Sequence, residues 1–314
     1  MPTLHPDALH LMDLIRAAGR PPFESLTPGQ AREAYAAGRI ALQPPPDPVA
    51  EVRDLSIPGP GGKLPLRLYR AAGTADAVLP AVLFLHGGGW VVGNLESHDG
   101  VCRRLANLAR CRVVAVDYRL APEHPFPAAV EDSATALAWM HADAAAHGFD
   151  PARIAVAGDS AGGNLAAVLA LMGRDGTVPA PCFQVLFYPV VDFAMDTPSY
   201  ARMTHDLPLT AASMLYFLDH YAPEAVRADW RASPLRAASL AGTPPALVMT
   251  AGHDPLCDEG RAYAERLERE GVQVTSLHLP GHVHGLLTMG RVIGAADGVL
   301  QYAAAVLRDS WRPG

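Results

Sequence analysis

The sequence has little that would tie it to a membrane, to nucleic acid or to an oxidising compartment. No apolar run among its 314 residues approaches the roughly 18 residues needed to cross a bilayer. Residues 1–20 lack the basic and apolar regions of a signal peptide. The net charge is −7 without a basic cluster, which argues against a nucleic-acid surface. The four cysteines, Cys102, Cys111, Cys182 and Cys257, form no Cys-x-x-Cys pair, so we expect free thiols and a cytoplasmic location.

What the sequence does contain is a balance typical of an enzyme. Half of the residues are hydrophobic and 18% are charged. The length allows one large domain or two small ones, and either can bury a substantial core.

Apolar, strand-like runs alternate with helical stretches over most of the chain. The runs are Ala81–Leu85, Val113–Val116, Ile154–Ala157, Cys182–Phe187, Ala246–Thr250 and Val274–Leu279. The helical stretches are Asp99–Leu108, Ala128–Ala146, Ala161–Gly173, Glu259–Glu270 and Gly290–Leu307. Continuous apolar strands with helices between them predict an α/β fold with a mostly parallel sheet covered on both faces. Before them, residues 51–69 indicate a β-hairpin around a Pro/Gly-rich turn.

Two segments fall outside this alternation. The first 47 residues contain apolar positions at helical spacing and a helix start at Thr27-Pro28-Gly29-Gln30, and a run of three prolines ends that helix. Residues 192–234 are too long for an ordinary connection and contain one clear helix, 211–221, which either forms a lid or simply packs on the core. We therefore predict N-terminal cap helices at 1–47, a core at 48–191, a cap insertion at 192–234 and the rest of the core at 235–314.

The segment Gly158-Asp159-Ser160-Ala161-Gly162 lies between a predicted strand and a predicted helix. In that context Gly-x-Ser-x-Gly is typical of a nucleophile elbow, whose glycines let strand and helix nearly touch. The alternative is an ordinary strand–helix turn with a capping serine. We predict that Ser160 is a nucleophile.

A nucleophilic serine needs a base, and the base needs a carboxylate that orients it. In a parallel sheet such groups collect beyond the C-terminal ends of the strands. Asp254 lies at the end of the strand predicted at Ala246–Thr250, and we predict that it is this carboxylate. Asp258 and Glu259 follow it and are better explained as charges at the start of the next helix.

Two histidines, His282 and His284, follow the last predicted strand on what we expect to be a loop. We favour His284 as the base because it precedes a glycine and a helix start. His282 is an alternative, and it could alter the pH profile. A metal site at this pair would need further ligands, so we predict no metal.

The segment His86-Gly87-Gly88-Gly89-Trp90 follows the strand at Ala81–Leu85. Consecutive glycines let the backbone approach a substrate oxygen with its amides exposed, as in the oxyanion loop of lipases and esterases. The amide of Ala161 would be a further donor. A phosphate-binding loop is disfavoured, because Gly-Lys-Ser/Thr and Gly-x-Gly-x-x-Gly are both missing.

Together these segments resemble the hormone-sensitive-lipase-like branch of the α/β-hydrolases, in its bacterial carboxylesterase subgroup with the GDSAGG motif. The resemblance covers roughly Val52 to the C-terminus. It rests on five motifs in the family's order: His86–Trp90, Asp117–Glu123, Gly158–Gly163, Asp254–Leu256 and His284-Gly285. It departs from the family at Cys257, where arginine is frequent, and at Leu286, where phenylalanine is frequent.

The resemblance implies an α/β-hydrolase fold with a helical cap. It also implies a triad of Ser160, Asp254 and His284, with the amides of Gly88, Gly89 and Ala161 as oxyanion donors. No metal or organic cofactor is implied. We further expect the substrate-binding residues to be Trp90, Tyr188, Leu256 and Leu286, and Arg119 and Glu123 to form a polar network beside the site.

We therefore predict a serine carboxylesterase that acts on short- to medium-chain acyl esters, as a monomer or homodimer, with no nucleic-acid partner and no membrane insertion. The alternatives are an amidase, lactonase or deacetylase on the same triad, or a receptor that binds a small molecule in the same pocket. A receptor would tolerate loss of the histidine, whereas this chain keeps all three triad residues.

Overall fold

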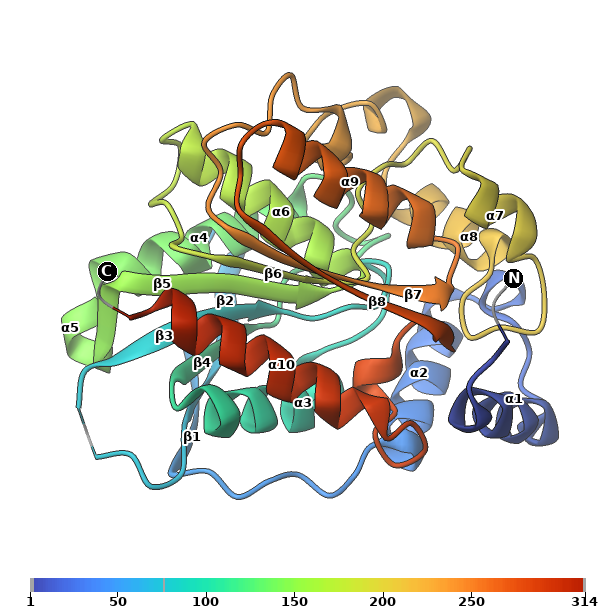
Figure 1. Cartoon of the computed structure of the whole chain (residues 1–314), viewed down its shortest axis with the longest axis horizontal. Coiled ribbons are helices and arrows are strands. Elements are labelled where there is room, and N and C mark those ends of the chain that lie inside the picture. Colours follow the sequence, from blue (N-terminus) through green and yellow to red (C-terminus); the bar gives the residue numbers. More distant parts are fainter. Residues whose placement is uncertain (1–2, 76, 313–314) are drawn as a thin grey trace.

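A computed structural model describes residues 3–75 and 77–312 of the chain (Figure 1). Its centre is an eight-stranded sheet with the order β1-β2-β4-β3-β5-β6-β7-β8. The strands are β1 Glu51–Gly59, β2 Gly62–Arg70, β3 Leu79–Leu85, β4 Arg112–Val116, β5 Phe149–Asp159, β6 Gln184–Phe187, β7 Ala246–His253 and β8 Val274–Val283. β1 and β2 form the predicted antiparallel hairpin, β2 pairs antiparallel with β4, and the strands from β4 to β8 are parallel. The predicted α/β-hydrolase fold with a mostly parallel sheet is confirmed.

Helices cover both faces of the sheet because successive apolar residues of the central strands point to opposite sides. The main helices are α1 Pro6–Ala18, α2 Pro28–Leu42, α3 Leu95–Ala109, α4 Ala128–Ala142, α5 Ala144–His147, α6 Ala161–Arg174, α7 Pro198–Arg202, α8 Ala211–Tyr221, α9 Cys257–Arg269 and α10 Ala295–Ser310. Leu83 and Val156 belong to one buried cluster, which includes residues of α4, α6 and α9. Val82 and Ala157 belong to the other, which includes residues of α3 and α10.

Several element boundaries differ from those the sequence predicts. The helix expected at Ala128–Ala146 is divided into α4 and α5, and α10 begins at Ala295 after a 3₁₀ turn at Leu286–Thr288. The last strand is longer than predicted, so His282 lies within β8 and not on a loop. β8 is an edge strand, and an edge strand tolerates the Pro280-Gly281 pair that suggested its end.

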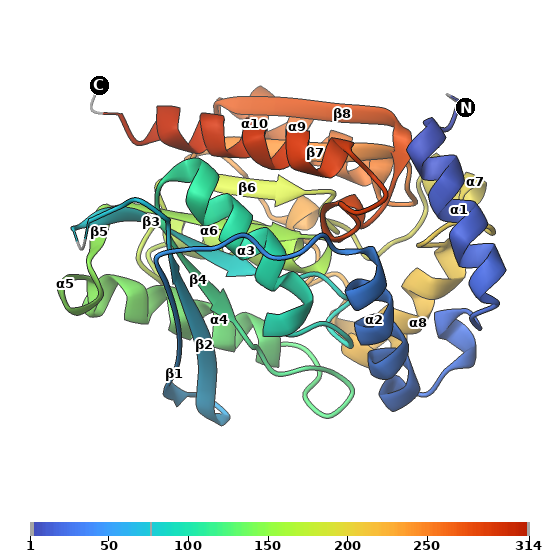
Figure 2. The ribbon, with the colours of Figure 1, turned by 90° about the horizontal axis from the view of Figure 1, so that it is seen from below.

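The helices α1, α2, α7 and α8 gather beyond the C-terminal ends of the parallel strands (Figures 1 and 2). We call these four the cap helices. α2 begins as its sequence predicts: the Thr27 side chain and Gln30 form a capping box, with Pro28 at the first helical position. α8 has the predicted bounds. The edge of the sheet where reactive groups are expected is therefore covered.

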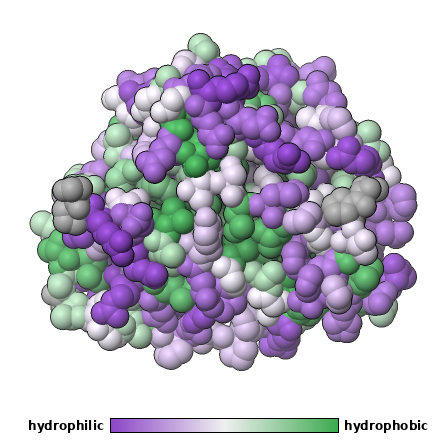
Figure 3. All heavy atoms as spheres, viewed as in Figure 1, coloured by the Kyte–Doolittle hydropathy of each residue, from purple (hydrophilic) through white to green (hydrophobic). Residues whose placement is uncertain are grey.

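Figure 3 shows hydrophilic side chains over most of one face, interrupted by apolar side chains near its middle. The cysteines are all free, as predicted. Within the described ranges, no helix has both the length and the apolar character that a membrane span requires.

Candidate active site

Ser160 lies at the turn between β5 and α6, and its backbone is strained. Its φ and ψ are 56° and −118°, a conformation that non-glycine residues rarely adopt. β5 and α6 approach so closely that a Cβ on Gly158 would lie 2.3 Å from the carbonyl carbon of Gly162, and a Cβ on Gly162 would lie 1.8 Å from the carbonyl oxygen of Leu85 in β3. This is the geometry of a nucleophile elbow, with the serine held at the C-terminal end of β5 and the start of α6.

The structure brings together the three residues predicted as a triad. Nε2 of His284 lies 2.9 Å from Oγ of Ser160, and Nδ1 of His284 lies 2.7 Å from Oδ2 of Asp254. Asp254 is completely buried, and its other oxygen accepts a hydrogen bond of 2.9 Å from the amide of Leu256. With the ring proton on Nδ1 directed at Asp254, Nε2 is free to accept the serine proton. The arrangement can therefore generate a serine alkoxide equivalent.

The second histidine, His282, takes no part in this chain of contacts. Its ring stacks on that of His5 with the centroids 4.6 Å apart. Burial, followed by the charge of His5, lowers the pKa of His282. Its position thus serves the junction between β8 and the segment that leads into α1, where the amide of His5 also donates to the carbonyl of Gly281 at 2.8 Å.

The glycine loop after β3 turns sharply beside Ser160. Gly88 and Gly89 have φ angles of 128° and 57°, and the carbonyl of Gly88 accepts the amides of Val91 and Val92. Both glycines line the same cavity as Ser160. Among residues 3–75 and 77–312, none accepts a hydrogen bond from the amide of Gly88, Gly89 or Ala161. These donors are available to a substrate oxygen.

The carboxylate of Asp159 holds the glycine loop in place, a role that the motif alone does not reveal. Its Oδ1 accepts the amide of Gly87 at 2.8 Å and lies 3.0 Å from Nε2 of His98. Burial opposes ionisation of Asp159, but the charge and hydrogen bond of His98 and the Gly87 amide together lower its pKa. The charged carboxylate therefore connects the elbow, the glycine loop and α3.

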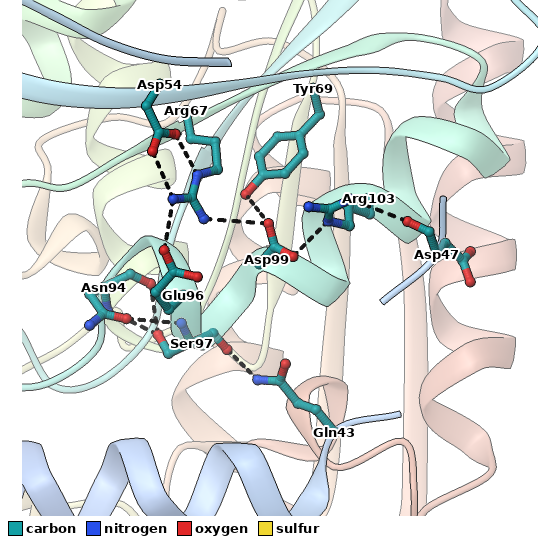
Figure 4. Close-up of polar contacts among 10 residues, drawn as sticks. All are labelled: Gln43, Asp47, Asp54, Arg67, Tyr69, Asn94, Glu96, Ser97, Asp99 and Arg103. Carbon is teal, nitrogen blue, oxygen red and sulfur yellow. Dashed lines mark hydrogen bonds and ion pairs between the residues drawn. The ribbon is translucent and has the colours of Figure 1, made fainter. Parts of the chain in front are cut away.

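Polar contacts hold the N-terminal turns of α3, which carries His98, in place (Figure 4). Asn94 and Ser97 form a capping box. Arg67 of β2 donates to Glu96 at 2.7 Å and to Asp99 at 3.5 Å. The side chain of Gln43, at the end of α2, donates to the carbonyl of Ser97. This part of α3 is thereby tied to both the sheet and the cap helices.

A small cavity of about 60 Å³ lies over Ser160 and His284, and we call it the catalytic cavity. Its wall is mostly apolar, with Phe23, Val92, Leu209, Met214, Phe217 and Met289 among the lining residues. Tyr35, Arg39 and Thr288 add polar groups. None of these cap-helix and loop residues carries a motif, so the sequence did not identify them.

The four residues expected to bind substrate do not line this cavity. Trp90, Tyr188, Leu256 and Leu286 are each at most 1% exposed. Trp90 stacks on Tyr221 with 4.3 Å between ring centroids, and the ring of Tyr188 lies 4.7 Å from that of His284. These side chains form the packed layer behind the site.

Arg119 and Glu123 also differ from the single network expected. Arg119 pairs with Asp132 of α4 at 2.9 Å, whereas Glu123 pairs with Arg32 of α2 at 2.5 Å. Asp258 and Glu259 lie in the first turn of α9, as predicted, and Glu259 accepts the amide of Val191 at 2.8 Å.

Comparison with known proteins places this geometry among ester hydrolases. A family model described as the alpha/beta hydrolase fold matches residues 82–288. The carboxylic ester hydrolase LipN of Mycobacterium tuberculosis is 42% identical over 273 residues, which are 85% of this chain and 72% of that protein. An ethyl acetate hydrolase of Pseudomonas putida is 40% identical over 303 residues, 94% and 95% of the two chains. Among solved structures, a metagenomic ester hydrolase from Lake Arreo, in complex with a bipyridine phosphonate derivative, has a TM-score of 0.95 at 42% identity and covers 98% of this chain and 99% of its own.

Proposed function

The chain belongs to the alpha/beta hydrolase family, and from this premise we propose that it is a serine carboxylesterase for short- to medium-chain acyl esters. The observation that carries the proposal is the continuous contact from Asp254 through His284 to Ser160 at the mouth of a covered cavity. The esterase names of its relatives support the same reaction class.

In the proposed reaction, Oγ of Ser160 attacks the ester carbonyl carbon while its proton moves to Nε2 of His284. Asp254 stabilises the imidazolium that forms. The carbonyl oxygen becomes an oxyanion and accepts hydrogen bonds from the amides of Gly88, Gly89 and Ala161. When the tetrahedral intermediate collapses, the carbon–oxygen bond to the leaving alkoxide breaks and His284 returns the proton to it.

The resulting acyl-enzyme is resolved by the same groups. Water gives a proton to His284 and its oxygen attacks the acyl carbonyl, a second oxyanion forms at the same amides, and Ser160 leaves with the proton from His284. In the net reaction, one ester and one water molecule give one carboxylic acid and one alcohol. The chain's own residues provide every proton transfer.

Cavity size supports the preference for short acyl chains. The catalytic cavity of about 60 Å³ is far below the roughly 300–1,000 Å³ of sites that enclose drug-sized ligands. Apolar side chains such as Phe217 and Leu209 close it and favour an aliphatic acyl group. A longer chain would have to displace them or leave the cavity.

The proposal is tested with ethyl esters of increasing acyl length, from acetate to decanoate, with a long-chain triglyceride, and with a matched lactone and amide. Ser160→Ala should lower kcat by about 10⁴-fold or more. Ser133→Ala is the control, because it also removes a buried hydroxyl, one that donates to the carbonyl of Ala129 at 2.7 Å. Near-normal turnover by Ser160→Ala, or activity that peaks on long-chain triglycerides, would contradict the proposal.

A further inference from the structure

Arg39 brings a guanidinium group to the catalytic cavity. It lies near the end of α2, and its Nη1 donates to Oγ1 of Thr288, four residues after His284 in the chain. Its guanidinium carbon lies 4.6 Å from the centre of the Tyr35 ring, a cation–π distance. Arg39, Tyr35 and Thr288 all line the catalytic cavity beside Ser160. A positive charge therefore lies in the proposed ester-binding space, whose lining also includes the carboxylate of Asp159.

The structure does not neutralise this charge. Among residues 3–75 and 77–312, no carboxylate lies within ion-pair distance of Arg39, and its Nε is buried without a hydrogen-bond partner. Burial raises the pKa of Tyr35 to about 12, so its phenol stays neutral and supplies no counter-charge. Arg32, about two helical turns earlier on α2, shows the contrast because it pairs with Glu123. A partly buried cation without a counter-charge is costly unless a ligand supplies one.

Arg39 also lines two larger hollows, one on each side of the catalytic cavity's lining. We call the hollow between α1, α2 and residues 204–210 the helical groove; it measures about 580 Å³ and shares Phe23, Tyr35, Arg39, Pro208 and Met289 with the catalytic cavity. The groove lining contains the guanidinium groups of Arg16, Arg20 and Arg39 and the carboxylates of Glu24 and Asp206. Arg16 is paired with Asp13 at 2.8 Å. Arg20 donates to the carbonyl of Ala34 at 3.0 Å and, like Arg39, has no carboxylate partner among the described residues.

The other hollow, which we call the acidic recess, measures about 500 Å³ and lies between α2 and residues 93–97 and 117–124. Its lining includes Glu96, Asp117 and Glu123. Glu96 is paired with Arg67 and Glu123 with Arg32. A substrate could therefore approach Arg39 from either hollow, and Arg39 itself is what favours an anion.

We propose that Arg39 is a specificity-determining residue that binds a carboxylate on the substrate, so that the preferred substrates are half-esters of short dicarboxylic acids. The inference rests on the proposed esterase function. The ester end would lie at Ser160 and the free carboxylate at the guanidinium. A short spacer is required because both groups line one small cavity, and a planar carboxylate matches the fork of donors that arginine presents.

The test compares ethyl esters that differ only at the far end of the acyl chain. Monoethyl glutarate carries a carboxylate, ethyl glutaramate carries a neutral amide of the same shape, and ethyl hexanoate carries an alkyl group. Acid release is followed by pH-stat titration. For the wild type, kcat/KM should be highest on monoethyl glutarate, and added glutarate should inhibit hydrolysis of ethyl hexanoate.

Arg39→Gln should lower kcat/KM on monoethyl glutarate by about 10- to 100-fold, mainly through KM, because hydrogen bonds to charged groups are the strong ones. Its effect on ethyl hexanoate should stay below about threefold. Arg39→Lys should recover part of the loss, since it restores the charge without the fork. Arg32→Gln is the matched control: it loosens the same helix without touching the catalytic cavity, and it should affect all three esters equally.

Equal losses on the charged and neutral esters in Arg39→Gln would show that Arg39 only anchors α2, and this would overturn the inference. The inference would also be overturned if the wild type hydrolysed ethyl glutaramate as well as monoethyl glutarate, or if glutarate inhibited wild type and Arg39→Gln alike. These results leave the esterase function intact. A wild-type protein that hydrolyses none of the three esters contradicts the proposed function itself.

Discussion

Asp159→Ala removes the carboxylate that lies under the oxyanion loop, and its effect can be worked out from two contacts. The substitution leaves the buried amide of Gly87 without its hydrogen-bond acceptor and removes the carboxylate that lies 3.0 Å from Nε2 of His98. An unsatisfied buried polar group costs about 1–3 kcal/mol. The free energy of unfolding should therefore fall by roughly 1–3 kcal/mol, together with the lost attraction to His98, which a domain with about 5–15 kcal/mol can survive.

Activity should fall separately from stability. Gly87 precedes the proposed donors Gly88 and Gly89, and an oxyanion donor acts only within about 2.7–3.1 Å of the developing charge. Loss of one such donor costs about 10²–10³ in kcat, so a loosened loop should cost about 10- to 100-fold. Activity is measured as kcat on ethyl butanoate, without urea and at a temperature where the variant remains folded. Stability is measured separately by urea unfolding followed by tryptophan fluorescence.

Asp159→Asn is the control, because it keeps an oxygen that can accept the Gly87 amide while removing the charge. It should lose less activity than Asp159→Ala. Folding lowers the pKa of Asp159, so its contribution to the free energy of unfolding is fully present above its ordinary value of 3.8. That contribution is lost only as the pH falls through the lower pKa of the folded state. The variants are therefore compared near pH 7. An Asp159→Ala variant with wild-type kcat and reduced stability would refute the link between this carboxylate and the oxyanion loop.

Other parts of the structure give predictions of the same kind. Burial lowers the pKa of His86 to about 3, so below about pH 6.5 the unfolded chain takes up a proton that the folded protein excludes. Through this group the free energy of unfolding should fall by about 1.4 kcal/mol per pH unit from pH 6 to pH 4. Urea titrations in which His86→Asn shows no flatter dependence on pH than the wild type would contradict this. Gly298→Ala lies in α10 with no atom within 4 Å of the new Cβ, and it should raise the free energy of unfolding by about 0.5–1 kcal/mol. Gly162→Ala would place its Cβ against backbone atoms, so it should prevent folding or lower Tm steeply. Equal Tm values for the two variants would be the contrary result. His282→Asn should leave the shape of the pH–rate profile unchanged and speed proteolysis near α1, because its ring contacts His5; a shifted profile with normal proteolysis would reverse that assignment.

The sequence predicted the parts of the site that are local in the chain. The elbow at Ser160 needs only a strand, a turn with close approach and a helix, and each leaves a mark within a few residues. Asp254 was found because it follows an apolar strand, and His284 because a glycine follows it. Strand order did not have to be known, since parallel strands bring their C-terminal ends to one edge.

The pocket lining could not be predicted in this way. Trp90 and Leu286 are close to the motifs in the chain, but their side chains point into the packed core, and no local pattern distinguishes that direction. Of the residues that do line the cavity, Arg39 and Phe217 come from cap helices and Phe23 from the 3₁₀ turn between α1 and α2, and the positions of these segments depend on packing between distant parts of the chain. Position along the chain is therefore a poor guide to which side chains meet the substrate.

The contacts of α2 explain why this helix matters for both catalysis and selection. Arg39 donates to Thr288, on the turn that follows the proposed base His284. Arg32 donates at 2.9 Å to the carbonyl of Val91, on the turn that follows the proposed oxyanion donors. Gln43, at the end of the helix, donates to Ser97 of α3, next to the histidine that contacts Asp159. A displacement of α2 would therefore reach the base, the oxyanion loop and its support together. The same helix also carries the guanidinium of Arg39, which has no ion-pair partner among the described residues. The residue that we propose for substrate selection is therefore attached to the groups that we propose for catalysis.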